Sequence, residues 1–114
     1  MPGSFTRESG ATGMRELLAA HPDVDAVFAA NDLMALGALT VLRAEGRRVP
    51  EDVALIGFDD IEITQHSEPP LTTIRQPVAE VAREMTREVL RQIDGLAPAG
   101  PCVLEPILVE RGTV

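Results

Sequence analysis

Two short, uninterrupted apolar segments constrain the fold of this chain most strongly. They are residues 26–30 (Ala-Val-Phe-Ala-Ala) and residues 53–58 (Val-Ala-Leu-Ile-Gly-Phe), and polar residues bound both of them. An apolar segment of this length is typical of a strand buried on both faces, as in a parallel sheet that helices cover. The two segments therefore predict a parallel sheet flanked by helices.

Three helical patterns surround the two predicted strands. The first covers residues 6–20 and ends before a His-Pro pair, because proline disfavours helical backbone in the residue before it. The second begins at Asn31, a favoured N-cap residue, and runs to about Glu45, with Gly46 as its C-terminal stop. The third begins at Pro77 and ends near Asp94. The alternation of helices and strands predicts an α/β fold built from βα units with right-handed crossovers.

The two later helices differ in the distribution of their apolar residues. The helix from Pro77 carries one apolar stripe, opposite a face of Glu and Arg residues spaced three apart. The stripe consists of Val78, Val81, Met85, Val89 and Ile93. The helix from Asn31 is apolar nearly all round, so one side covers the sheet and the other needs a partner. That partner is either a second subunit or another part of the same chain.

The composition argues against several classes of protein. Surfaces that bind a nucleic-acid backbone are basic, so the formal net charge of −8 disfavours such a contact. The single cysteine, Cys102, has no internal disulfide partner, which points to a reducing compartment. The sequence has neither an apolar segment of membrane-spanning length nor the pattern of a signal peptide, so we expect a cytoplasmic protein without membrane contact.

Polar side chains follow both predicted strands. Asn31 and Asp32 come directly after the first strand, and Asp59 and Asp60 come after the second, so all four are expected at the same rim. Ligands of open parallel sheets bind beyond the carboxyl ends of the strands. An amide and a carboxylate at this rim suit a neutral, hydroxyl-rich ligand, and Phe5 could cover the apolar face of its ring. Each residue also has a purely structural interpretation: Asn31 caps a helix, an aspartate caps the turn, and Phe5 packs in the core.

No motif for catalysis or for cofactor binding stands out. The sequence contains no Gly-rich phosphate loop and no Gly-x-Ser-x-Gly elbow. Cys102 has no candidate base nearby in sequence, and His21 and His66 lack partners at metal-ligand spacing. We therefore expect a binding protein rather than an enzyme, with no metal and no cofactor.

Five segments, collinear over nearly the whole chain, carry a family resemblance. They are residues 3–10 (Gly-Ser-Phe-Thr-Arg-Glu-Ser-Gly), 29–37 (Ala-Ala-Asn-Asp-Leu-Met-Ala-Leu-Gly), 48–61 (Arg-Val-Pro-Glu-Asp-Val-Ala-Leu-Ile-Gly-Phe-Asp-Asp-Ile), 69–77 (Pro-Pro-Leu-Thr-Thr-Ile-Arg-Gln-Pro) and 108–113 (Leu-Val-Glu-Arg-Gly-Thr). They resemble signatures of the lactose-repressor/galactose-repressor (LacI/GalR) family of bacterial transcriptional regulators. In these regulators an N-terminal helix-turn-helix binds an operator, and a two-lobed, periplasmic-binding-protein-like domain senses a sugar or related metabolite.

The resemblance implies roles for particular residues. Asn31 and Asp59 match effector-contacting positions, and Phe5 matches an aromatic residue that stacks on the effector. Ser4 stands where an acidic residue is common in the family. The helix from Asn31 and the segment from Ile61 to Pro69 match the contact of a homodimer. The residues assigned to this contact are Leu33, Leu36, Leu39, Thr40, Ile61 and Ser67.

The resemblance also implies a division of the chain. Residues 1–114 correspond to part of an effector-binding and dimerisation domain of the type I periplasmic-binding-protein-like fold. Residues 1–76 and 103–114 match its C-terminal lobe, and residues 77–95 match a helix that packs on the N-terminal lobe. That lobe, the strand before Gly3 and the helix-turn-helix through which DNA would be bound lie outside this chain, so the fold is expected to be incomplete.

Two other functions remain open beside that of a sugar-responsive regulator lacking its DNA-binding domain. The chain could be the C-terminal lobe of a periplasmic sugar-binding protein that serves a transporter. It could also be an interaction module that pairs with a full-length regulator. Residues 69–77 and 108–113 favour the regulator over the transport protein.

Overall fold

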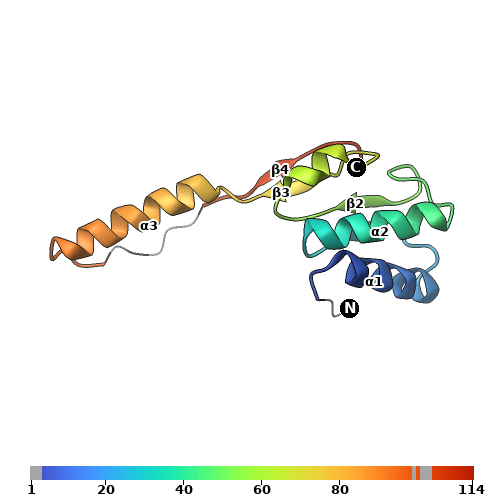
Figure 1. Cartoon of the computed structure of the whole chain (residues 1–114), viewed down its shortest axis with the longest axis horizontal. Coiled ribbons are helices and arrows are strands. Elements are labelled where there is room, and N and C mark those ends of the chain that lie inside the picture. The colour runs from blue at the N-terminus through green and yellow to red at the C-terminus, as the bar shows by residue number, and fades with distance from the viewer. Residues whose placement is uncertain (1–3, 99, 101–103) are drawn as a thin grey trace. The chain divides into compact units, whose positions relative to one another are not determined.

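Helices and strands alternate along the chain in the computed structural model, which describes residues 4–98, 100 and 104–114 (Figure 1). The elements are α1 (Arg7–Ala20), β1 (Ala26–Phe28), α2 (Asp32–Ala44), β2 (Ala54–Ile56), the 3-10 helix η1 (Glu62–His66), β3 (Thr73–Arg75), α3 (Val78–Ile93) and β4 (Ile107–Val109). They form two units, which are Met1–Arg75 with Leu108–Val114 (unit 1) and Gln76–Ile107 (unit 2). Cys102 lies outside the described residues.

The predicted parallel sheet is present in unit 1 as β1 and β2. Val27 lies opposite Leu55, and both strands are three residues long, shorter than the apolar segments that predicted them. Leu55 is fully buried, but Phe28 is 60% exposed, so the expected burial on both faces is wrong for β1. Within the described residues β1 pairs with β2 alone, which leaves its outer edge and Phe28 uncovered.

Beyond β2, the structure continues with segments that are distant in sequence. Ile56 forms a parallel bridge with Thr72, and the Leu55 amide donates to the Thr113 carbonyl at 2.8 Å. Strand β3 follows Thr72 and pairs with β4 in a second, two-stranded sheet. The C-terminal residues of the chain are therefore part of the core of unit 1.

Helices α1 and α2 pack against each other unusually closely (Figure 1). A methyl group on Gly10 would collide with the Met34 backbone, and one on Gly37 would collide with the Arg7 carbonyl. Both glycines thus allow backbone-to-backbone contact. Beneath this helix pair lies the core, whose largest fully buried apolar side chains are Leu42, Val53, Leu55 and Leu71.

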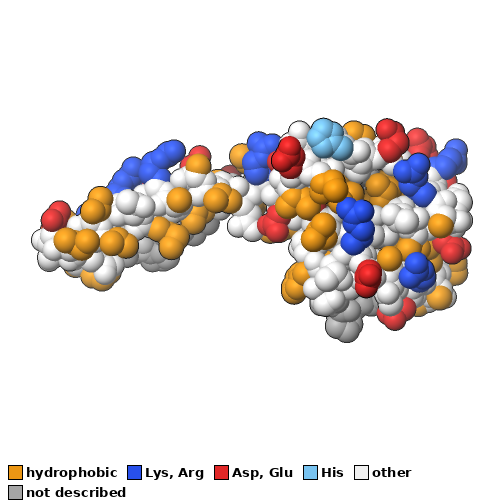
Figure 2. Space-filling model, in the orientation of Figure 1, with side chains coloured by type: hydrophobic (Ala, Val, Ile, Leu, Met, Phe, Trp, Pro, Cys, Tyr) orange, Lys and Arg blue, Asp and Glu red, His pale blue; other side chains and the backbone are white. Residues whose placement is uncertain are grey.

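Unit 2 contains α3, whose boundaries agree with the sequence pattern. Pro77 precedes the helix, and Gly95 follows it with a φ of 79°, a left-handed conformation that glycine adopts without strain. The expected Glu–Arg pairs include Arg87–Glu84 at 2.6 Å and Arg91–Glu88 at 3.6 Å. None of the α3 residues, all of which the structure describes, is buried, and hydrophobic side chains stand exposed along the helix (Figure 2).

Candidate functional site

The segments that follow β1 and β2 lie side by side in unit 1. The Ala29 amide donates to the Ile56 carbonyl at 2.8 Å, and the Asp32 amide donates to the Phe58 carbonyl at 3.0 Å. The residues after the two strands therefore share one edge, as the parallel register requires. We call residues 59–61 the ligand loop, after the effector contact that the sequence predicts for Asp59.

Asn31 has both a structural contact and a contact with a second predicted site residue. Its Oδ1 accepts from the Met34 amide at 2.8 Å, so the N-cap interpretation is confirmed. Its Nδ2 donates to the Phe5 carbonyl at 3.0 Å. The Phe5 side chain is 62% exposed, so the interpretation of Phe5 as a core residue is wrong. The structure thus brings Asn31 and Phe5 together at the edge of the sheet.

Three residues at this edge have left-handed backbone conformations. The φ angles are 59° at Phe5, 108° at Asp59 and 57° at Asp60. Such angles are uncommon outside glycine, and each costs on the order of 1–3 kcal/mol unless the surroundings enforce it. Strained backbone of this kind concentrates at ligand sites. It occurs here at two of the three predicted effector residues.

The Asp60 carboxylate is bound by two arginine side chains. It accepts from Arg75 Nε at 2.8 Å and from Arg111 Nη2 at 2.7 Å. Burial acts to raise the pKa of the Asp60 carboxyl, but the hydrogen bonds and charges of Arg111 and Arg75 outweigh it and hold the pKa below its ordinary value. Arg111 Nη1 also donates to the Leu71 carbonyl at 2.9 Å. Asp60 therefore joins the ligand loop to β3 and to the C-terminal segment.

Asp32 occupies an interior position that its place in the sequence does not reveal. The strand end was expected to present Asp32 at the rim beside Asn31, but the residue is only 1% exposed. Its Oδ2 accepts from the Ile61 amide at 2.8 Å, and its Oδ1 accepts from Thr73 Oγ1 at 2.6 Å. The expectation for Asp32 is wrong because its carboxylate satisfies buried donors beneath the ligand loop.

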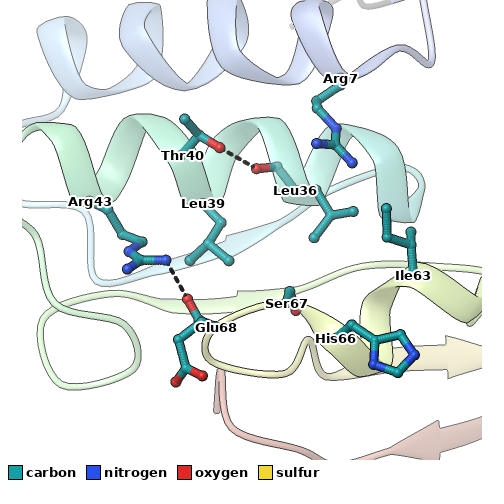
Figure 3. A pocket seen from close by; sticks show the side chains of 9 residues that line it. All are labelled: Arg7, Leu36, Leu39, Thr40, Arg43, Ile63, His66, Ser67 and Glu68. Atoms are coloured by element: carbon teal, nitrogen blue, oxygen red, sulfur yellow. Dashed lines mark hydrogen bonds between the residues drawn. The ribbon is translucent and has the colours of Figure 1, made fainter.

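A second feature of unit 1 is a hollow of about 370 Å³ between α2 and η1 (Figure 3). Its lining consists of Arg7, Leu36, Leu39, Thr40, Arg43, Ile63, His66, Ser67 and Glu68. Four of the six predicted dimer-contact residues are among them. Of the other two, Leu33 lies on α2 and is 39% exposed, and Ile61 is half-buried just before η1. Ile63 and His66 fall within the predicted contact segment from Ile61 to Pro69, but they were not named individually because the sequence did not predict η1.

The hollow combines an apolar floor with a charged margin. Leu36 and Leu39 extend from α2 toward Ser67, and Ile63 and His66 extend from η1 (Figure 3). Arg43 Nη1 donates to the Glu68 carbonyl at 2.7 Å, which fixes one side of the margin. In the space-filling view, the visible surface of unit 1 shows hydrophobic side chains interspersed with basic and acidic ones (Figure 2). Protein interfaces likewise combine an apolar centre with a polar rim.

Neither a metal centre nor a membrane helix is found in the described part of the chain. Among residues 4–98, 100 and 104–114, no three His, Cys, Asp or Glu side chains are close enough to bind a metal ion together. No helix within these same ranges has both the length and the apolar character needed to cross a bilayer.

The sequence over residues 2–114 matches the family described as periplasmic binding protein-like domain. The chain belongs to this family. It is 58% identical over 93 residues to the HTH-type transcriptional regulator CelR of Thermobifida fusca, an alignment that covers 82% of the chain and 27% of that relative. This member of the periplasmic-binding-protein-like family therefore spans about a quarter of the length of that regulator.

Solved structures of related regulators share its fold. A transcriptional regulator CelR–cellobiose complex has a TM-score of 0.89 and 52% identity, covering 98% of this chain and 35% of that one. The lac repressor dimer bound to operator and the anti-inducer ONPF has a TM-score of 0.88 and 33% identity, covering 97% of this chain and 39% of that one. The resemblance to LacI/GalR regulators and the partial periplasmic-binding-protein-like fold are thus confirmed, and these relatives are regulators rather than enzymes.

Proposed function

We propose that this chain is the effector-sensing and dimerising part of a sugar-responsive transcriptional regulator. The observation that carries the proposal is the edge of the sheet in unit 1. There Asn31 contacts Phe5, and the adjacent ligand loop presents Asp59 on a left-handed backbone. DNA binding is assigned to a helix-turn-helix outside these 114 residues, in keeping with the description of the CelR relative as an HTH-type transcriptional regulator.

The ligand of this site is proposed to be a neutral sugar. The Asp59 carboxylate can accept hydrogen bonds from two neighbouring hydroxyl groups, and the Asn31 amide can both donate and accept. The exposed Phe5 ring can cover the apolar face of a sugar ring. Phe5, Asn31 and Asp59 form one wall of the site. Cellobiose, which the related CelR structure contains, is the first ligand to test.

The hollow between α2 and η1 is proposed to form a homodimer contact. The contact residues are Leu33, Leu36, Leu39, Thr40, Ile61 and Ser67. The exposed side chains of Leu33 and Ile63 supply apolar area to bury, and the arginines and Glu68 at its margin supply charges of both signs. An interface related by a two-fold axis needs such a self-complementary surface. The lac repressor, a relative with the same fold, is a dimer in its solved structure.

Unit 2 is assigned a separate part in this proposal. Residues 77–95, which comprise α3 and the residues that flank it, are proposed to pack on an N-terminal lobe through the exposed apolar stripe. Residues 1–76 and 103–114 are proposed to supply the C-terminal lobe. The protein is placed in the cytoplasm, where an operator would be reached, and is assigned no catalytic role. The alternative of a transport protein's binding lobe is weaker, because the relatives described above are transcriptional regulators.

Titration of the chain with cellobiose, followed by amide chemical shifts, tests the ligand assignment. Asp59→Asn should weaken binding by about tenfold to a hundredfold, because charge-assisted hydrogen bonds are lost. Asparagine tolerates left-handed backbone, so the loop conformation should persist. Asp23→Asn, at an exposed loop position outside the site, is the matched control. Equal affinities of the wild type and Asp59→Asn would remove Asp59 from the site.

Sedimentation equilibrium at tens of micromolar tests the dimer assignment. Leu33→Asp should convert a dimer into a monomer, because it places a charge in an apolar contact. Thr12→Asp, at an exposed position on α1, should leave association unchanged. A wild-type chain that sediments as a monomer would contradict the assignment.

A further inference from the structure

All three backbone amides of the ligand loop donate to groups in β3 or α2. The Asp59 amide donates to the Ile74 carbonyl at 2.8 Å, and the Asp60 amide donates to Thr73 Oγ1 at 3.2 Å. The Ile61 amide donates to Asp32 Oδ2 at 2.8 Å. The left-handed conformations at Asp59 and Asp60 are therefore enforced from outside the loop.

Asp32 and Thr73 are the two side chains on which this arrangement depends. The Thr73 hydroxyl donates to Asp32 Oδ1 at 2.6 Å and accepts from the Asp60 amide, so it bridges the carboxylate and the loop. Asp32 is 1% exposed and Thr73 is fully buried, so neither side chain is accessible to a ligand. Nearby, Gly57 leaves the space that the carboxylate occupies, because a Cβ atom at position 57 would collide with Asp32 Oδ1.

We propose that Asp32 and Thr73 are positioning residues of the ligand site. They hold residues 59–61 in the conformation that presents the Asp59 carboxylate, and they fasten this loop to β3. The inference rests on the proposed function, since it assigns a task to the surroundings of the same site. It adds that these hydrogen bonds link a ligand bound to Asp59 with β3. From β3 the chain continues into Gln76 and unit 2.

The pair Thr73→Val and Thr72→Val separates positioning from general stability. Both threonines are fully buried, neighbouring residues, and valine replaces a hydroxyl with a methyl group of similar size. The Thr72 hydroxyl accepts from the Arg111 amide at 2.9 Å, whereas the Thr73 hydroxyl accepts directly from the Asp60 amide of the ligand loop. A loss of amide protection or of affinity in Thr73→Val but not in Thr72→Val therefore reports on the ligand loop.

Amide hydrogen exchange of the ligand-free chain gives the first measurement. In Thr73→Val the Asp60 amide should exchange at least about tenfold faster because it loses its acceptor, and the Ile61 amide should follow because its acceptor Asp32 loses the hydroxyl of Thr73. The Leu55 amide, in the core strand, should keep its protection. Thr72→Val should leave the loop amides unchanged, and Thr73→Ser, which keeps the hydroxyl, should restore their protection. Equal loop exchange in Thr73→Val and the wild type would overturn the inference.

Cellobiose affinity gives the second measurement. Thr73→Val should bind cellobiose about tenfold more weakly than Thr72→Val, and Thr73→Ser should bind like the wild type. Equal affinities of the two valine variants would overturn the inference while leaving the sugar assignment intact. Failure of the wild type to bind cellobiose would instead count against the proposed function, and the exchange measurement would still decide the positioning role. Should Thr73→Val not fold, Thr73→Ala against Thr73→Ser makes the same comparison.

Discussion

Helices α2 and α3 have similar lengths but opposite relations to the rest of the chain. Eight of the 13 residues of α2 are buried, and α2 contributes Leu42 and Gly37 to the interior of unit 1. Helix α3 has 16 residues, a more regular apolar stripe and no buried residue. A regular apolar stripe therefore marks a face that can be buried, whereas burial itself depends on the segments available to cover it.

The difference predicts that stability is concentrated in α2. Leu42→Ala should destabilise the chain by about 2–5 kcal/mol, because it creates a cavity at a fully buried position. Leu90→Ala on α3, where the leucine is 56% exposed, should change stability by less than about 0.5 kcal/mol. Urea unfolding followed by far-UV circular dichroism suits a chain without Trp or Tyr. Equal losses in both variants would remove the contrast.

The glycine of the α1–α2 contact gives a sharper test of the same contrast. Gly37→Ala should cost about 1–3 kcal/mol, because the new methyl group meets the Arg7 carbonyl and the helices must separate. Gly13→Ala on α1 should stabilise by about 0.5–1 kcal/mol, since nothing lies near its added Cβ atom and alanine favours helix. Opposite signs in thermal unfolding are expected, and a stabilising Gly37→Ala would contradict the close packing.

Asp60 should make the stability of unit 1 depend on pH. Its pKa is lower in the folded chain than in the unfolded chain, so its contribution is present above an unfolded pKa of about 3.9. The contribution is lost as the pH falls from about 4 through the lowered folded pKa. The stability difference between the wild type and Asp60→Asn should therefore shrink below about pH 4. A difference that stays constant down to pH 2 would contradict the arginine contacts as its cause.

The smallest effect is expected on the polar face of α3. Glu84→Gln removes the partner of Arg87 at 2.6 Å, but the Arg87 side chain is largely exposed. Pairs of this kind are worth about 0.2–0.5 kcal/mol, so helicity by circular dichroism should fall only slightly at low salt and not at high salt. A larger loss would show that α3 depends on its charged face.

Local signals made the helices predictable from the sequence. The Asn31 cap, the proline before α3 and the glycines after α2 and α3 act within a few residues, and the structure confirms each boundary. The parallel pairing of β1 and β2 followed from their apolar composition. The burial of β1 did not follow, because it depends on a neighbouring strand and not on the strand itself.

The environment of the ligand loop was beyond sequence reasoning. The contact between Arg111 and Asp60 joins residues 51 positions apart, and the contact between Thr73 and Asp32 joins residues 41 apart. No periodicity or motif in the chain connects such positions. The short helix η1 places Ile63 and His66 at the hollow. No capping residue or periodic pattern in the sequence predicted this helix. The positions of Phe5, Asn31 and Asp59 as effector contacts stay a prediction.

The left-handed backbone at Phe5, Asp59 and Asp60 has a consequence for redesign of the proposed sugar site. A combinatorial library that randomises these positions would be filtered twice, first by backbone conformation and then by the ligand. Branched residues such as Val, Ile and Thr would be depleted in every selection, whereas Gly, Asn and Asp would be enriched even without a sugar. A selection without ligand therefore provides the baseline against which any enrichment at these positions measures recognition.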